Sequence, residues 1–275
     1  MTTRLQTLDG FYQNHIQPHY QNAHQAEKER KPIAWVASTF PVEILQAMNI
    51  TPIWQENYAS VCAARQISVQ LAEIAERHGY SRDLCSYART VIGSILTEEK
   101  GILPEGGMPK PNFLVASTAA CDTHLKWFRV LSRHLKRPLY LLDVPYNITG
   151  ADAESLETSH VQQYVTQLEE LITFLEKQTC TTLDKNKLRK AIALSDRTSS
   201  LWLEIQDHRK TIPTPMGARD AFSAVFYMLC LPATQTAVDF YEKLRDEVKE
   251  RTRSGIGVIQ NERHRLIWDN LPMWF

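Results

Sequence analysis

The 275-residue sequence lacks a net charge, a long hydrophobic run and a leader-like N-terminus. Lys+Arg and Asp+Glu both number 31, so nothing in the charge balance favours a nucleic-acid partner. No apolar stretch approaches the ~20 residues that a membrane-spanning helix needs. The polar start, MTTRLQTLDGFYQNHIQPHY, has no signal-peptide core. We therefore expect a cytoplasmic protein that binds neither membrane nor nucleic acid.

Two kinds of local motif are also missing. No C-x-x-C pair occurs among the five cysteines, which excludes a local zinc knuckle or a thioredoxin-type motif. Their odd number argues against a disulfide framework. The segment GILPEGGMPKPN (101–112) has neither a G-x-G-x-x-G nor a P-loop pattern, so a nucleotide site is unsupported. Any metal site would have to be assembled from cysteines far apart in the sequence.

Apolar runs alternate with helical patterns in the first half of the chain. This alternation is typical of a doubly wound parallel α/β sheet, Rossmann-like or flavodoxin-like. Ser81 is a plausible first residue of one helix and Gly79 a natural end of another. The patterns predict strands at 32–39, 50–57, 113–118 and 138–145, and helices at 41–48, 59–79, 81–96 and 122–135.

The second half of the chain predicts helices at 155–179, 183–210, 217–230 and 234–253. HRLIWD (264–269) then predicts the start of a further strand, and the apolar end NLPMWF has nothing to pack on. The expected organisation is an N-terminal helical arm (1–30), an α/β domain (31–149), an added helical subdomain (150–255) and the truncated start of a second α/β domain (256–275).

Chemistry is expected where the predicted strands end, because open parallel sheets bind ligands at their carboxyl edge. The polar and thiol groups at these positions should converge on one edge. They are Ser38 and Thr39, Glu56 to Tyr58, Cys121 with Asp122, and Asp143.

Cys121 leaves two interpretations open. At a strand-to-helix turn, the positive helix end favours a thiolate, which serves as a nucleophile or a metal ligand. Beside Ala119 and Ala120, the same residue is an ordinary small core side chain. His124 makes a Cys–His pair conceivable, without a diagnostic spacing. For Cys85, expected on the helix 81–96 between Leu84 and Ser86, the position favours a core role over a ligand role, while Cys62, Cys180 and Cys230 are interpreted as structural.

Long segments resemble a known family. GYSRDLCSYARTVIGS, GGMPKPNFLVASTAACDTHLKWFRVL and PLYLLDVPYN are similar to subunits of the 2-hydroxyacyl-CoA dehydratase and benzoyl-CoA reductase family. IAWVASTFPVEILQAMNITPIWQENYAS resembles the family's opening strand-helix-strand, and GIGVIQNERHRLIWDNLPMWF its approach to a second α/β domain.

The resemblance implies a cofactor and partners. Family subunits hold a 4Fe–4S cluster through three cysteines, and Cys85 and Cys121 match two of them. The third lies in the second α/β domain, which this sequence lacks, so a partner chain, a longer chain or loss of the cluster are the alternatives. A homologous second subunit, in a heterodimer or homodimer, and an ATP-dependent iron–sulfur activator are the implied partners.

The implied chemistry is loss of water from an (R)-2-hydroxyacyl-CoA to give an enoyl-CoA. One electron reduces the thioester to a ketyl radical anion, which expels the 2-hydroxyl group. Ser38 and Glu56 are candidate catalytic residues, for a substrate oxygen or for acid–base work, and Arg89 and Lys126 are candidates to offset the charge of a cluster. A benzoyl-CoA reductase-type subunit that reduces an aromatic acyl-CoA, and a non-catalytic scaffold or fragment, are the alternatives.

Overall fold

A computed structural model describes residues 4–145, 153–259 and 261–267. Its contacts divide the chain into two compact units. The α/β unit comprises Asn22–Asp184, and the helical unit comprises the described residues of Met1–Gln21 and Lys185–Trp274. The domain boundaries expected from the sequence stay a prediction.

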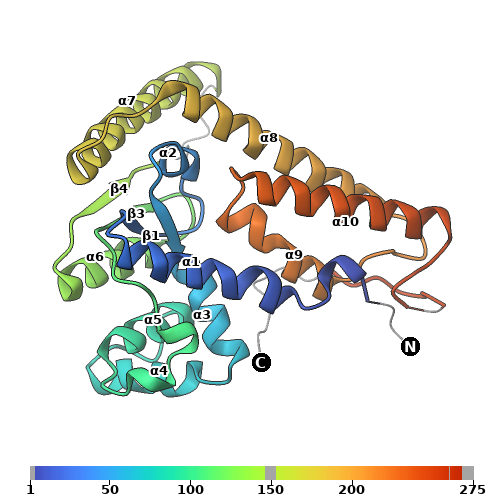
Figure 1. Ribbon diagram of the computed structural model, residues 1–275, viewed down its shortest axis with the longest axis horizontal. Helices are drawn as coiled ribbons and strands as arrows, with labels where there is room; N and C mark the ends of the chain where they lie inside the picture. The colour runs from blue at the N-terminus through green and yellow to red at the C-terminus, as the bar shows by residue number, and fades with distance from the viewer. Residues whose placement is uncertain (1–3, 146–152, 260, 268–275) are drawn as a thin grey trace. The chain divides into compact units, whose positions relative to one another are not determined.

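The α/β unit is built on a four-stranded sheet in the order β2-β1-β3-β4 (Figure 1). Neighbouring strands are parallel throughout. All residues of β1 and β3 are buried, as expected for central strands of a sheet that is covered on both faces. The chain moves from β1 outward to β2 and then to β3 on the other side, which confirms the predicted doubly wound fold. The strands are β1 (Ile33–Val36), β2 (Thr51–Trp54), β3 (Phe113–Ser117) and β4 (Leu139–Leu142).

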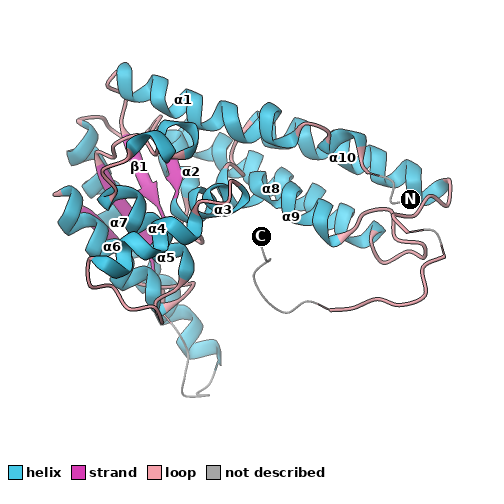
Figure 2. Ribbon diagram, turned by 90° about the horizontal axis from the view of Figure 1, so that it is seen from below, coloured by secondary structure: helices cyan, strands magenta, loops and turns pink. Residues whose placement is uncertain are grey.

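Helices enclose the strands of this unit (Figure 2). Phe174 of α7 packs its ring against Phe113 of β3 and Tyr140 of β4, with centroids 5.7 and 5.5 Å away. Helix α6 contacts the same two strands and lies on the opposite side of β4 in Figure 1. The helices are α2 (Val42–Ala47), α3 (Gln55–Ala64), α4 (Ser68–Arg77), α5 (Ser86–Leu96), α6 (Asp122–Leu135) and α7 (Ala153–Thr179), with short 3₁₀ turns at Lys100–Ile102 and Pro104–Gly106.

The single helix predicted at 59–79 is wrong, because the structure divides this stretch into α3 and α4. Gln66 lies between them with a φ of 60°, a left-handed conformation that ends a helix. The predicted end at Gly79 is correct. Gly79 has a φ of 90°, and its N–H bonds the carbonyl of Glu76 at 2.9 Å.

The helix predicted at 81–96 begins five residues later than expected, at Ser86. The Oγ of Ser81 accepts the N–H of Asp83 at 3.1 Å, so Ser81 closes a turn instead of starting the helix. Cys85 therefore does not lie on the helix. It is the N-cap residue of α5, with an extended ψ of 131°.

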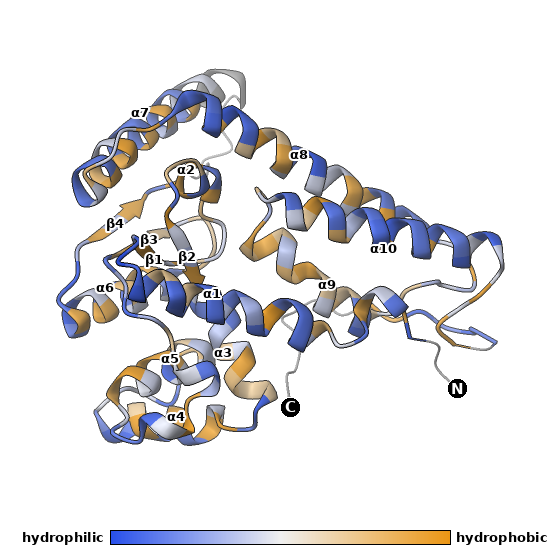
Figure 3. Ribbon diagram, viewed as in Figure 1, coloured by the Kyte–Doolittle hydropathy of each residue, from blue (hydrophilic) through white to orange (hydrophobic). Residues whose placement is uncertain are grey.

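The helical unit confirms the helices predicted in the last third of the chain. Its α8 and α10 are joined by ion pairs between Arg197 and Glu242 (2.8 Å) and between Arg245 and Glu204 (3.0 Å). Figure 3 shows hydrophobic and hydrophilic residues alternating along both helices, as expected for one buried and one solvated face. The elements are the 3₁₀ turn Gln6–Leu8, the short π-helix Tyr12–Ile16, the start of α1 (Gln17–Lys28), α8 (Lys185–His208), α9 (Ala218–Cys230) and α10 (Gln235–Arg253).

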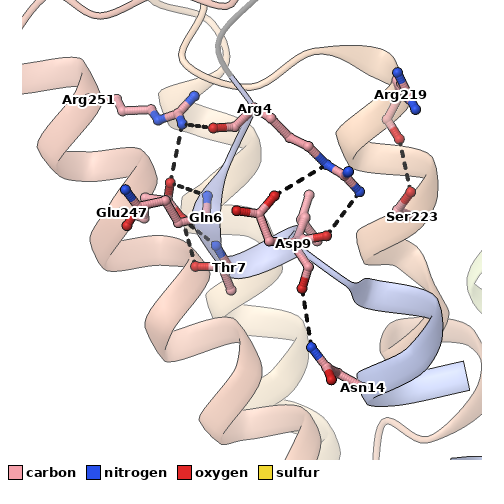
Figure 4. Close-up of polar contacts among 10 residues, drawn as sticks. Arg4, Gln6, Thr7, Asp9, Asn14, Arg219, Ser223, Glu247 and Arg251 are labelled. Atoms are coloured by element: carbon pink, nitrogen blue, oxygen red, sulfur yellow. Dashed lines mark hydrogen bonds and ion pairs between the residues drawn. The ribbon is translucent and has the colours of Figure 1, made fainter.

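The N-terminal segment is anchored to α10 by Glu247 (Figure 4). Its carboxylate accepts the backbone N–H of Gln6 at 2.7 Å and that of Thr7 at 2.8 Å. The hydroxyl of Thr7 donates to the same carboxylate at 2.7 Å, and Arg251 pairs with it at 3.3 Å. One carboxylate of α10 thus holds the N-terminal segment against the C-terminal part of this unit.

The predicted strand at 264–269 is only partly described. Residues 264–267 form neither helix nor strand, and Leu266 and Ile267 are 94% and 95% exposed. Residues 268–275, with the rest of that strand and NLPMWF, lie outside the described residues. Among the helices that the structure describes, none has the length and apolar character needed to cross a bilayer.

Candidate functional site

Three predicted site residues follow neighbouring strands at one edge of the sheet. Ser38 lies two residues beyond β1, Glu56 two beyond β2, and Cys121 four beyond β3. Because the strands run parallel in the order β2-β1-β3, their carboxyl ends share this edge. The expected convergence of strand ends is therefore a property of the fold.

Ser38 and Glu56 are in direct contact. The backbone N–H and the hydroxyl of Ser38 both donate to Oε1 of Glu56, each at 3.0 Å. Glu56 lies in the first turn of α3, because β2 ends at Trp54 and not at residue 57 as predicted.

His124 joins the same carboxylate. Its Nε2 lies 2.6 Å from Oε1 of Glu56, and the residue is only 6% exposed. The sequence suggested His124 as a partner for Cys121, but the structure pairs it with Glu56. The sequence did not predict this contact, because it depends on the order of the strands. Helix α6 follows β3 and α3 follows β2, and the two helix starts share one edge of the sheet only in this order.

Unsatisfied polar atoms gather around this contact. Of five buried side-chain N or O atoms without a hydrogen-bond partner among the described residues, four belong to the start of α3 or to α6. Buried polar atoms are nearly always hydrogen-bonded, so such a concentration is typical of a place where a ligand or water completes the bonds. The four atoms are Oε1 of Gln55, Oε2 of Glu56, Nδ1 of His124 and Nε1 of Trp127.

The turn between β3 and Cys121 is held by hydroxyl groups. Ser117 Oγ accepts the N–H of Ala119 at 3.1 Å and lies 3.2 Å from the hydroxyl of Thr39. The hydroxyl of Thr118 donates to Asp143 at 3.1 Å. Thr39 and Asp143 thus fix the polypeptide that leads into α6, and Asp143 is engaged within the protein.

The two predicted cluster cysteines occupy matching places. Cys121 is the exposed N-cap residue of α6, and Cys85 is the half-exposed N-cap residue of α5. Both thiols are free, and α5 and α6 contact each other. The positive ends of two helices therefore lie next to the two sulfur atoms, which favours anionic ligation there.

Arg89 fixes the loop that presents Cys85. Its Nε donates to the carbonyl of Leu84 at 3.0 Å, and its Nη1 pairs with Glu76 of α4. Lys126 is exposed and pairs with Asp122 at 2.5 Å. Both cations expected to offset a cluster's charge already have a carboxylate partner.

The fit of an iron–sulfur cluster is incomplete within the described part of the chain. No group of three or more His, Cys, Asp or Glu side chains there is placed to hold a metal ion. Thiolates are the usual cluster ligands, so Cys85 and Cys121 suit the cofactor by chemistry. They supply two of the three expected cysteines, and ligation by them stays a prediction.

The other cysteines differ in environment. Cys62 is buried in α3, and burial raises the pKa of its thiol to about 12, against a smaller lowering by its hydrogen bond with Tyr58. Cys230 is buried as well, whereas Cys180 is exposed just beyond α7. A buried protonated thiol suits the structural role expected of Cys62.

A family model described as 2-hydroxyglutaryl-CoA dehydratase, D-component, matches residues 37–275. The chain belongs to this family. The match includes Ser38, Glu56, Cys85 and Cys121, and it confirms the resemblance found in the sequence.

Curated relatives of this family member carry two kinds of name. The (R)-2-hydroxyisocaproyl-CoA dehydratase alpha subunit of Clostridioides difficile is 29% identical over 93% of this chain and 61% of its own length. The lactoyl-CoA dehydratase subunit alpha of Anaerotignum propionicum is 27% identical over 92% and 62%. A benzoyl-CoA reductase subunit of Thauera aromatica is 30% identical over 84% and 55%. The chain thus spans about three fifths of the length of the dehydratase relatives that it matches.

Proposed function

We propose that the chain is part of a 2-hydroxyacyl-CoA dehydratase subunit that removes water from an (R)-2-hydroxyacyl-CoA to give an enoyl-CoA. Family membership and the names of the dehydratase relatives support this assignment. The observation that carries it is the contact of Ser38 with Glu56 at the sheet edge where β3 leads into Cys121. A carboxyl group and an exposed thiol at one edge match a reaction that needs both a proton site and a metal ligand.

Cys85 and Cys121 are the proposed ligands that this chain contributes to a 4Fe–4S cluster. A cluster held there would supply one electron to the substrate thioester and would take it back when the enoyl-CoA forms, since the dehydration has no net redox change. A separate ATP-dependent iron–sulfur activator is the proposed electron source. A homologous subunit is the proposed partner, in keeping with relatives that are named alpha subunits.

Glu56 is the proposed proton site. Its Oε1 accepts both donors of Ser38 and lies 2.6 Å from Nε2 of His124, whereas Oε2 is buried and has no partner among the described residues. Oε2 is therefore the oxygen that we assign to proton transfer, because Oε1 is already engaged within the protein. It holds the proton that the 2-hydroxyl oxygen takes on leaving as water, and the proton lost from the β-carbon restores it.

The experiment is anaerobic co-expression of the chain with a homologous subunit and the activator, followed by analysis of acyl-CoA products. Glu56→Gln should lower kcat by about 10²- to 10⁴-fold, the usual contribution of a positioned acid or base. Glu73→Gln is the matched control, since Glu73 is an exposed glutamate on α4. Full activity of Glu56→Gln would remove Glu56 from the mechanism.

The alternative function is reduction of an aromatic acyl-CoA, favoured by the 30% identity to the benzoyl-CoA reductase subunit of Thauera aromatica. The same preparation separates the two. An enoyl-CoA from a 2-hydroxyacyl-CoA supports the dehydratase, and a cyclic dienoyl-CoA from benzoyl-CoA supports the reductase. Absence of both products would support a non-catalytic scaffold or fragment.

A further inference from the structure

We propose that His124 is a positioning residue that holds Glu56 with Oε2 directed to the substrate. This inference rests on the proposed function, because it assigns the proton-transfer role to Glu56. It adds a residue from α6, the helix that begins beside Cys121, to the pair Ser38 and Glu56. The proton site and the proposed cluster ligand are thereby tied to one helix.

The contact is short and sheltered. His124 Nε2 lies 2.6 Å from Oε1 of Glu56, and the two side chains are 7% and 18% exposed. A polar contact of this length is strengthened by low solvent exposure, because little water competes for the two groups. The contact is therefore strong enough to decide how the carboxylate is oriented.

Residues from two different parts of the sheet edge contact the carboxyl group of Glu56. Ser38, beyond β1, brings its N–H and hydroxyl to Oε1, while His124 reaches the same atom from α6. The two donors of Ser38 and the nearby Nε2 of His124 together restrict the rotation of the carboxyl group about its terminal bond. Without His124, only donors from Ser38 would remain, and the carboxyl group could turn.

The second ring nitrogen of His124 also bears on its role. Nδ1 of His124 is buried and has no partner among the described residues. Buried polar atoms are nearly always hydrogen-bonded, so a ligand or a water molecule is expected to complete the bonds of this nitrogen. Nδ1 of His124 and Oε2 of Glu56 are therefore the two atoms of this contact that are left for a ligand O–H.

The ring itself is held firmly by its own helix. Its centroid lies 5.9 Å from that of Trp127 and 6.4 Å from that of Phe128, and both aromatic residues are buried. Packing of this kind restricts the ring to one orientation. His124 can therefore help to fix the position of the Glu56 carboxyl group.

Two substitutions separate the polar contact of His124 with Glu56 from the packing of the His124 ring. His124→Leu removes the donor and keeps an apolar side chain, whereas His124→Gln keeps an N–H at a reach similar to Nε2. His124→Leu should lower kcat by about 10- to 100-fold with little change in KM, because misplacement of a reacting group acts on the transition state. His124→Gln should stay within about threefold of the original kcat.

A second readout needs no turnover. The Ser38 N–H donates to Glu56, so amide hydrogen exchange at Ser38 reports whether the carboxylate is held. Exchange should accelerate in His124→Leu and return towards the original rate in His124→Gln. The control is His134→Leu, an exposed residue of the same helix that bonds Tyr80, which should change neither kcat nor Ser38 exchange.

The outcomes are decisive in each combination. Unchanged kcat or unchanged Ser38 exchange in His124→Leu overturns the proposal, and so does a His124→Gln variant as impaired as His124→Leu. If the unsubstituted complex dehydrates no 2-hydroxyacyl-CoA, the proposed function fails. The exchange rates then still decide whether His124 holds Glu56.

Discussion

Glu247 is the residue on which the N-terminal segment of the helical unit depends. Burial alone would raise the pKa of its carboxyl group, but the hydrogen bonds from Thr7 and Gln6 and the charge of Arg251 outweigh burial and lower the pKa below its usual value. The folded protein therefore favours the ionised form more than the unfolded chain does. Stability from this group is present above the unfolded pKa and is lost as the pH falls through the lowered folded pKa.

Glu247→Gln should lower the free energy of unfolding by about 1–2 kcal/mol at pH 7, since it removes charge-assisted bonds from a half-buried site. The deficit should be smaller at about pH 3, below the usual glutamate pKa, because the original carboxylate then begins to be protonated as well. Urea unfolding at both pH values measures it. Glu250→Gln, at an exposed site that pairs with Arg253 on the same helix, should change stability by less than about 0.5 kcal/mol. A deficit that stays constant with pH would contradict the ionic account.

The residues of the candidate site show what sequence patterns can and cannot supply. Ser38, Glu56 and Cys121 were predictable because each follows an apolar run, and parallel strands align their ends. The contact of His124 with Glu56 was not, because it joins residues far apart in the sequence through the strand order. The order itself is set by packing of the whole sheet, which no local pattern encodes.

Among the elements, α5, which has Cys85 as its N-cap residue, is packed very closely on α4. A Cβ atom at Gly93 of α5 would lie only 1.9 Å from the carbonyl oxygen of Leu71 in α4. Glycine is therefore required for the two backbones to approach. The position of Cys85 at the start of α5 depends on this approach.

Gly93→Ala should destabilise the protein by about 3 kcal/mol, because the added methyl group must force two helices apart. Thermal and urea unfolding measure the loss. Gly101→Ala is the matched control, since a Cβ atom there has no neighbour within 4 Å, and it should be close to neutral. A Gly93→Ala variant as stable as the control would mean that α4 and α5 do not pack as described.

The elements also show why some boundaries were predicted and others were not. Helix α6 begins and ends where its strong amphipathic pattern does, at Asp122 and Leu135. The start of α5 was wrong because Ser81 and Asp83 favour a tight turn as much as a helix start. Contacts of Arg89 with the loop before Ser86 accompany the later start, and they depend on α4 being in place.

At the scale of the whole molecule, the open matter is how a cluster would be completed. The chain spans about three fifths of the length of its dehydratase relatives, and it offers two of the three cysteines expected. A cubane cluster with only two protein thiolates has irons that an external ligand can reach. Retention of iron should therefore depend on a further chain or segment that supplies the third thiolate.

After anaerobic reconstitution with iron and sulfide, we expect the chain by itself to lose iron to a chelator faster than its complex with a homologous subunit does. Cys85→Ser and Cys121→Ser should each lower bound iron, because each removes one of the proposed thiolates. Cys180→Ser is the control, since Cys180 is exposed but has no place among the proposed ligands. Iron and sulfide analysis with visible absorbance measures the result without any turnover. Full chelator resistance of the chain alone would place every ligand within these 275 residues, and equal iron in the Cys85→Ser and Cys180→Ser variants would exclude Cys85 as a ligand.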